Sequence, residues 1–244
     1  MKRGITIMVR TAKITYLYNS GFIVELKDCA LIFDYYIDKK NCLPSILAKY
    51  QKIYFFVSHS HFDHWNPDIG EFSAKVTKYF ISYDIHDRKT LPIDKTVVLN
   101  EYDNYTDNQI KVISYSSTDA GISFFVETNG WKIFHAGDFN WWHWKADTAQ
   151  NNAFARNGFA KQMKKLIGLQ TDITFFPIDT RLEDCCDWGV KEFCRNTDVK
   201  NLIAMHNAGR SPWPLPNNFA GNNRPINIWS PAQPGQNTTI TETD

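Results

Sequence analysis

Apolar residues in the first half of the chain fall into short runs that predict β-strands. Residues 13–18 and 22–26 are rich in β-branched and aromatic side chains, and the turn sequence NSG at 19–21 between them indicates a hairpin. The run at 53–57 (IYFFV) is apolar throughout, which is typical of a strand buried on both faces. The same criteria predict further strands over residues 30–33, 76–82, 96–99, 110–115, 122–127 and 131–136.

The second half of the chain alternates strands with helices. Residues 153–167 carry an imperfect apolar stripe at helical spacing, and residues 187–196 predict a shorter helix with Asp187 as its N-cap. A meander of strands followed by this alternation predicts two sheets whose outer faces are covered by helices. The remaining predicted elements are a helix over 44–51 and strands over 173–178, 202–205 and 226–229.

Length and composition favour one globular domain. The 244 residues are 43% apolar and 22% charged, so the chain can bury a sizeable core. We found no repeat or low-complexity linker, and we therefore expect a single domain over residues 1–244. In this interpretation residues 1–12 are an N-terminal extension, and the Pro/Asn-rich tail at 211–244 wraps the surface.

Charge and cysteine usage limit which cellular compartment and which binding partners we expect. A formal net charge of +1 provides no global basic field, which argues against nucleic acid and leaves a small molecule as the expected partner. We expect no membrane association, because no apolar run reaches the roughly 18 residues of a membrane span. The N-terminus has no signal-peptide run, and five cysteines without a CxxC pair fit free thiols, so we expect a cytoplasmic protein. Nothing in the sequence indicates the oligomeric state.

One short segment concentrates metal-ligand chemistry. The buried run at 53–57 is followed by VSHSHFDHWNP, in which three of the seven histidines and one aspartate lie within six positions. His59 and His61 are two residues apart, so in extended chain they point to the same side, and Asp63 and His64 follow after a turn. Imidazole and carboxylate suit zinc, manganese, iron or nickel, and four ligands from one loop suggest two metal ions.

Two later strand ends offer the remaining ligands. Asp138 follows the predicted strand WKIFHA and the flexible Gly137, and it is either a ligand or a turn aspartate that caps its neighbours. His206 ends the apolar strand LIAM. His135 has the opposite strand parity to Asp138, so we expect it to support or pack against the site and not to bind metal.

These motifs resemble the metallo-β-lactamase superfamily, and especially its small lactonase-like and ribonuclease-Z-like members. The resemblance lies in the H-x-H-x-D-H motif, the later Gly-Asp and strand-end histidine, and the opening hairpin that ends at Asp34, and it spans residues 13–206. It implies an α+β fold with four layers, αββα, and metals between the edges of the two sheets. It also implies that Asp34 accepts a hydrogen bond from a ligand histidine. The implied ligands are His59 and His61 for metal 1, Asp63, His64 and His206 for metal 2, and Asp138 as the bridge.

The sequence departs from the family at one ligand. The family supplies a further histidine for metal 1 from a loop that here reads SYSSTDAG, residues 114–121, and contains none. Asp119 is the best replacement because a carboxylate binds the same ions. Metal 1 is therefore weaker, differently occupied or absent, and we expect one or two ions per chain, with zinc as the first choice.

The expected activity is metal-dependent hydrolysis of a small ester, lactone or phosphoester by a metal-bound hydroxide. Asp63 would orient the attacking hydroxide or take its proton, and His143 would contact an anionic group or act as the acid. The aromatic segment FNWWHW at 139–144 is either a pocket wall or packed core, and Asp179 is a candidate supporting residue. Arg181 and Arg210 are either anion contacts or plain surface residues. The alternatives are a ribonuclease-Z-like phosphodiesterase and a non-catalytic metal-binding member of the fold.

Overall fold

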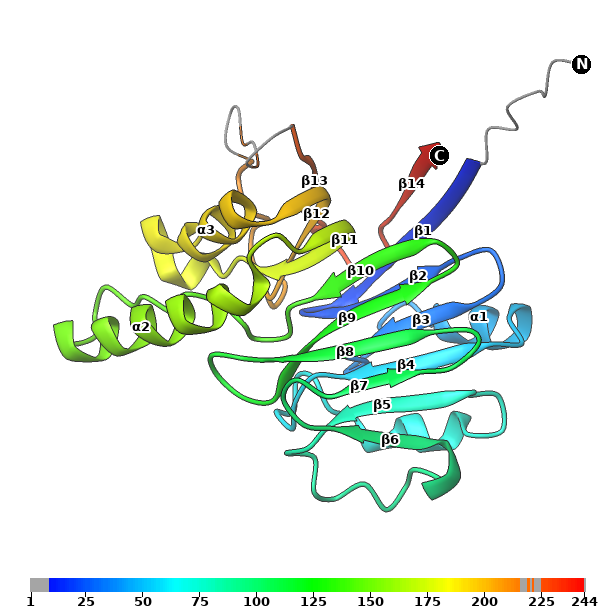
Figure 1. Cartoon of the computed structure of the whole chain (residues 1–244). Coiled ribbons are helices and arrows are strands. Elements are labelled where there is room, and N and C mark those ends of the chain that lie inside the picture. The colour runs from blue at the N-terminus through cyan, green and yellow to red at the C-terminus, as the bar shows by residue number, and fades with distance from the viewer. Residues whose placement is uncertain (1–8, 216–218, 220, 222–224, 244) are drawn as a thin grey trace, which may run out of the picture.

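Two seven-stranded sheets form the centre of the molecule (Figure 1). The computed structural model describes residues 9–215, 219, 221 and 225–243. The first sheet has the order β14-β1-β2-β3-β4-β5-β6 and the second the order β13-β12-β11-β10-β9-β8-β7. The first sheet contains β1 (Val9–Tyr18), β2 (Gly21–Glu25), β3 (Ala30–Phe33), β4 (Ile53–Val57), β5 (Lys78–Ser82), β6 (Thr96–Leu99) and β14 (Asn237–Thr243). The second contains β7 (Asn104–Thr106), β8 (Lys111–Ser116), β9 (Ile122–Thr128), β10 (Trp131–His135), β11 (Gln170–Pro177), β12 (Asp198–Met205) and β13 (Asn227–Trp229).

Helices cover the outer face of each sheet, which completes four layers. Helix α1 (Leu43–Lys49) buries Leu43 and Ile46 in an apolar cluster with the first sheet. Helices α2 (Ala149–Leu166) and α3 (Trp188–Asn196) lie together over β10 to β12 on the other side (Figure 1). Three short 3-10 helices, η1 (Pro67–Phe72), η2 (Ile93–Lys95) and η3 (Thr180–Cys185), complete the connections. The predicted αββα fold is confirmed.

Aromatic rings fill the space between the sheets. Phe22 of β2 lies 4.7 Å from Phe175 of β11 between ring centroids, and Phe56 of β4 lies 5.3 Å from Phe124 of β9. Alternate residues of the same strands, such as Phe55, face α1 in the outer cluster. This two-sided burial is why β4 is apolar at every position.

The direction of the strands brings several loops to one edge of the sandwich. In the first sheet β3 to β6 run parallel, and in the second β10 to β13 run parallel. The carboxyl ends of parallel neighbours meet at the same edge of a sheet, where α/β proteins carry their sites. The ends of β3, β4, β10, β11 and β12 therefore position the candidate residues.

Two strands were not predicted from the sequence. Residues 104–106 form β7, and the tail forms β14, which pairs with β1 in antiparallel register. Strand β1 starts at Val9, so part of the predicted extension is sheet; residues 1–8 of that extension lie outside the described residues. The tail residues 216–218, 220, 222–224 and 244 lie outside them as well.

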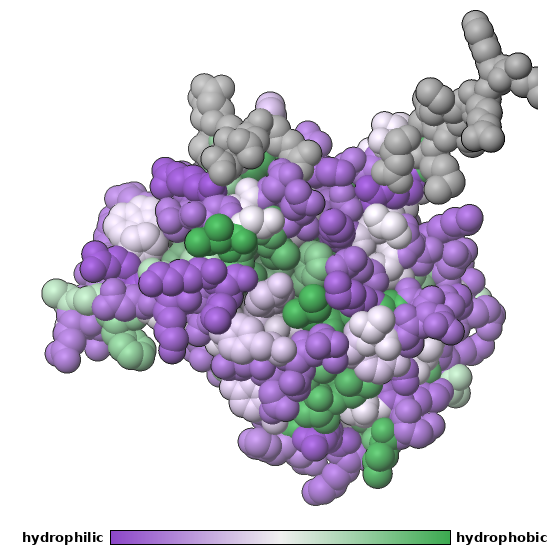
Figure 2. Space-filling view, viewed as in Figure 1, coloured by the Kyte–Doolittle hydropathy of each residue, from purple (hydrophilic) through white to green (hydrophobic). Residues whose placement is uncertain are grey.

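The face of the molecule in Figure 2 is mostly hydrophilic. Figure 2 shows polar residues over most of the face in view, with small hydrophobic patches between them. Within the described part of the chain, no helix is both long and apolar enough to cross a membrane.

Candidate metal centre

Strand ends from both sheets bring the predicted ligands together. His59 follows β4, Asp138 follows β10 and His206 follows β12. Three groups of side chains place their ligand atoms within 4.8 Å of one another. These groups are His59, His64 and Asp138; Asp63, His64 and His206; and His61, Asp119 and Asp138. All seven predicted metal ligands therefore lie in one cluster, and Nε2 of His59 lies 3.0 Å from Nδ1 of His61, the pair predicted to share metal 1.

Asp138 lies at the centre of this cluster. Its Oδ1 is 3.3 Å from Nε2 of His64 and 3.5 Å from Nε2 of His206, while its Oδ2 is 3.5 Å from Nε2 of His59. Two ligands of one tetrahedral zinc are about 3.3 Å apart, since each sits about 2.0 Å from the ion. The two oxygens of Asp138 thus face two different sets of imidazoles, as a bridging carboxylate requires.

Unpaired buried atoms show that the cluster fits a cation. Nε2 of His64 and Oδ1 of Asp138 are both buried, and neither has a hydrogen-bond partner among the described residues. Leaving a buried carboxylate oxygen unpaired costs free energy, so such atoms are rare in folded proteins. A divalent ion between them would satisfy both atoms.

The opposite nitrogen of each buried histidine is held by another polar group. Nδ1 of His64 lies 2.7 Å from Asp34, and Nδ1 of His206 lies 3.1 Å from Asp179. Nδ1 of His59 lies 2.9 Å from the Ser58 hydroxyl. Such partners fix the tautomer and would leave Nε2 free to bind a metal. The contact predicted for Asp34 is present in the structure, and Asp179 has the supporting position suggested by the sequence.

Protonation differs between the buried groups. Burial lowers the pKa of His59 to about 4, so this imidazole is neutral at pH 7. Burial alone would also lower the pKa of His206, but the carboxylates of Asp138 and Asp179 raise it to about 10. Burial alone would raise the pKa of Asp138, yet the imidazoles of His64 and His206 hold it well below its usual range. These carboxylates favour the protonated imidazole of His206, so a cation would compete with a proton there and metal affinity should rise with pH.

A backbone turn aims one of these side chains. Strand alternation by itself would point Asp138 to the same face as Phe134, which packs against α3. The strand ends at His135 instead, and Gly137 has a φ of +55°, which turns Asp138 into the cluster. His135 stays behind, stacked on Phe33 at 4.9 Å, and it belongs to none of the ligand groups found in the described chain.

Asp119, the predicted replacement for the missing histidine, lies at the edge of the cluster near His61 and Asp138. Its Oδ2 lies 4.0 Å from Nδ1 of His61, and half of each side chain is exposed. By contrast, His59 and His64 are fully buried. The His61–Asp119 side of the cluster is thus open to solvent, whereas the Asp138–His64–His206 side is enclosed.

The structure does not bring His143 into the cluster. Its ring lies 4.8 Å from that of Trp188, and it lines a pocket that contains none of the metal-ligand candidates. Asp63 does line the cavity beside the ligand cluster, which is also lined by His61, Asp138 and His206 and is called the metal cavity below. Arg181 lines this cavity too, while Arg210 is an exposed residue outside it.

Asn19 is a site residue that sequence reasoning missed. Its Nδ2 donates to Asp63 at 2.9 Å, and its Oδ1 accepts from the backbone of Ala208 at 3.1 Å. Asn19 also has a φ of +53°, the conformation that made it a turn signal. The turn assignment was correct, but nothing in one sequence indicates which loops an asparagine will join.

Comparison with known proteins identifies solved structures with a similar fold. No protein-family model and no curated protein sequence matches the chain. Among solved structures, Igni18, a metallo hydrolase from the archaeon Ignicoccus hospitalis, matches 94% of this chain and 98% of its own, with 16% identity and a TM-score of 0.63. The metallo-β-lactamase fold protein YhfI from Bacillus subtilis matches 95% of this chain and all of its own, with 13% identity and a TM-score of 0.55.

A third similar structure has a different activity. CmlA, a diiron β-hydroxylase from Streptomyces venezuelae, matches 80% of this chain and 44% of its own, with 10% identity and a TM-score of 0.51. At such identities the similarity establishes the fold and leaves the reaction open. The sheet order, the helical layers and these three structures agree: the chain has the metallo-β-lactamase fold.

Proposed function

We propose that this protein is a metal-dependent hydrolase that acts on a small ester, lactone or phosphoester. The observation that carries the proposal is Asp138, whose two oxygens face His59 on one side and His64 and His206 on the other at the separations of shared metal ligands. A divalent ion held there would lower the pKa of a coordinated water to about 7 and polarise the substrate.

Asp63 would handle the proton of the attacking water. Its Oδ2 is held by Asn19, and its side chain is 28% exposed at the cavity. The second oxygen is left to accept a proton from a water and to pass it to the leaving group. No serine or cysteine with an organised base is required for this chemistry.

Metal content and turnover test the proposal together. The purified protein should contain one or two equivalents of metal and should hydrolyse 4-nitrophenyl acetate or a simple lactone. Asp138→Ala should lower both metal content and kcat/KM at least tenfold, since the variant removes a ligand that two of the three groups share. Asp87→Ala, at an exposed aspartate paired with Lys89, is the matched control and should change neither.

Other outcomes identify the alternatives. Stoichiometric metal without hydrolysis of any ester, lactone or phosphoester would favour the non-catalytic member of the fold. Salt-sensitive RNA cleavage would favour the ribonuclease-Z-like phosphodiesterase. Full metal content in Asp138→Ala would contradict the bridging role and the proposal with it.

A further inference from the structure

One wall of the metal cavity is not used by the chemistry above. The cavity has a volume of about 340 Å³, and Trp142, Trp144 and Arg181 line it beside the ligands Asp138 and His206. Two indoles and a guanidinium at the mouth of a metal site form an apolar surface with one fixed cation, which is the composition of a small-molecule pocket.

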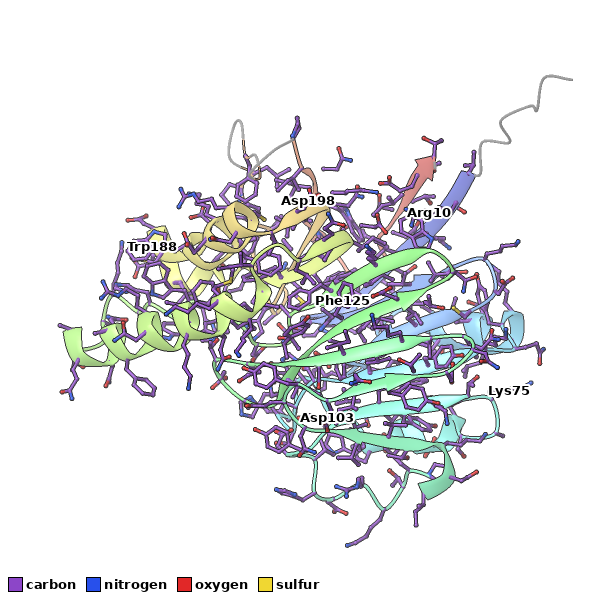
Figure 3. All side chains as sticks on the ribbon, in the orientation of Figure 1. Arg10, Lys75, Asp103, Phe125, Trp188 and Asp198 are labelled. Atoms are coloured by element: carbon purple, nitrogen blue, oxygen red, sulfur yellow. The ribbon has the colours of Figure 1, made fainter. Side chains whose placement is uncertain are left out.

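The tryptophans belong to a segment that separates two cavities. Trp142 and Trp144 line the metal cavity, whereas Trp141 and His143 line a separate pocket of about 600 Å³. Trp188, labelled in Figure 3 beside the two helices, lies on that second side. Alternate residues of the segment therefore face opposite cavities, and the even positions are a wall of the site and not packed core.

This wall is held rigidly against the metal ligands. The ring of Trp142 lies 5.3 Å from that of His206, and its Nε1 donates to the backbone oxygen of Asp138 at 2.9 Å. The rings of Trp142 and Trp144 are 6.5 Å apart with only 10° between their planes. A flat group can lie against such parallel rings without any rearrangement of the site.

Arg181 is fixed by the same carboxylate that orients His206. Its Nε donates to both oxygens of Asp179 at 2.9 and 2.8 Å, its Nη2 donates to Asp179 as well, and its guanidinium lies 5.4 Å from the ring of Trp144. Asp179 is fully buried, but the side chain of Arg181 is 44% exposed. Its Nη1 has no partner in the described part of the chain. The N–H groups of Nη1 are therefore left to donate hydrogen bonds to a ligand in the cavity.

We propose that Arg181 binds an oxyanion, a carboxylate or a phosphate, on a substrate whose flat or ring-shaped part packs against Trp142 and Trp144. This inference rests on the proposed hydrolase function and names its substrate class. Asp179 links the guanidinium to His206, so the anion sits at a set spacing from the bond that is cleaved. A weakly hydrated, pre-oriented guanidinium favours such a group over a neutral one.

Ligand binding tests the inference without turnover. The zinc-loaded protein is titrated with benzoate, phenylphosphonate and neutral benzamide, with calorimetry and tryptophan fluorescence as readouts. At least one anion should bind about tenfold or more tightly than benzamide, and Arg181→Gln should reduce this ratio of Kd values about tenfold. If Arg181→Gln weakens the binding of benzoate alone, the substrate group is a carboxylate. If the variant weakens the binding of phenylphosphonate alone, the substrate group is a phosphate.

Two controls separate anion binding from a structural role. Arg210→Gln, at an exposed arginine four residues after His206, should leave the ratio unchanged. Arg181→Lys should restore part of this ratio of Kd values, because lysine keeps the positive charge but lacks the planar paired donors of the guanidinium. An unchanged ratio in Arg181→Gln, an equal loss for anions and benzamide, or the loss of zinc from this variant would each overturn the inference.

Turnover then separates this inference from the hydrolase proposal. If 4-nitrophenyl acetate is hydrolysed but the preference for its anionic counterpart mono-(4-nitrophenyl) succinate is unaffected by Arg181→Gln, the hydrolase stands and the anion site fails. If the binding ratio falls but no ester, lactone or phosphoester is cleaved, the anion site stands and the hydrolase proposal fails.

Discussion

Asn19 shows how a residue that is not itself a candidate ligand can connect the loops of a candidate metal centre. Its side chain joins Asp63, in the loop after β4, to Ala208, in the loop after β12. Its backbone oxygen also accepts from the backbone of His206 at 3.1 Å. Residues that orient ligands in this way commonly change metal affinity by about 10- to 100-fold when they are removed.

We predict that Asn19→Gly lowers metal affinity about tenfold, because glycine keeps the positive φ but frees Asp63. Competition with a chromogenic chelator measures the affinity. Asn129→Gly is the matched control: Asn129 also has a positive φ, +51°, but it lies in the turn between β9 and β10. Equal losses in the two variants would show that the turn conformation matters and the contact with Asp63 does not.

At the scale of elements, the site depends on loops that pack closely against one another. Gly121, just before β9, has a φ of +63°, and a Cβ there would lie 2.1 Å from the backbone oxygen of Ser58 and 2.5 Å from Cβ of His59. The loop of the missing histidine therefore touches the start of the histidine motif, and only glycine allows that approach.

Gly121→Ala should displace the His59 loop and reduce both stability and metal binding. Gly168→Ala is the control, since Gly168 has a φ of +78° but nothing within 4 Å of a new Cβ. The control should lose about 1–2 kcal/mol from backbone strain alone. Gly121→Ala should lose roughly 1–3 kcal/mol more from the clash. Urea unfolding measures the difference, and equal losses would refute the contact.

The elements that carry the site were predictable because their sequences are locally consistent. The predicted bounds of β3, β4 and β6 match the structure, and Asp138 and His206 were placed at the ends of β10 and β12. A buried strand is recognisable from an apolar run, and a following ligand residue is recognisable from its chemistry. The layered fold followed from the order of these elements.

The missed elements lack that local signal. Strand β14 reads NTTITET, with exposed and half-buried residues in alternation, and it is a strand because β1 pairs with it from the other end of the chain. The direction of the Asp138 side chain could not be predicted from strand alternation alone, because the turn at Gly137 changes the face to which this side chain points. Helix α2 exposes Phe154, an apolar residue within the helix predicted over residues 153–167. In each case tertiary context decides.

At the scale of the whole molecule, a buried carboxylate ties the two sheets together. Asp172 of β11 lies 3.1 Å from the guanidinium of Arg10, which comes from β1 in the other sheet and is labelled in Figure 3. Asp172 also pairs with Lys200 at 2.7 Å and accepts from the backbone of Lys132 at 2.9 Å. Burial alone would raise the pKa of Asp172, but Arg10 and Lys200 lower it.

The stabilisation from Asp172 should therefore depend on pH. Because the folded-state pKa lies below the unfolded one, the stabilisation is present above about pH 4 and is lost as the pH falls through the folded-state pKa. Asp172→Asn should cost about 1–3 kcal/mol at pH 7. Urea unfolding at pH 7, 5, 4 and 3 should show that the difference between the two proteins shrinks toward acid. A constant difference would contradict the charge-based account.

The most direct test of the metal centre is the position of the ion. Anomalous diffraction from crystals of the zinc-loaded protein should show a peak about 2.0–2.2 Å from Oδ1 of Asp138, Nε2 of His64 and Nε2 of His206. A second, weaker peak should lie beside His61 and Asp119, where the ligands are half-exposed. Zinc bound only away from Asp138, or no ordered zinc at all, would contradict the account.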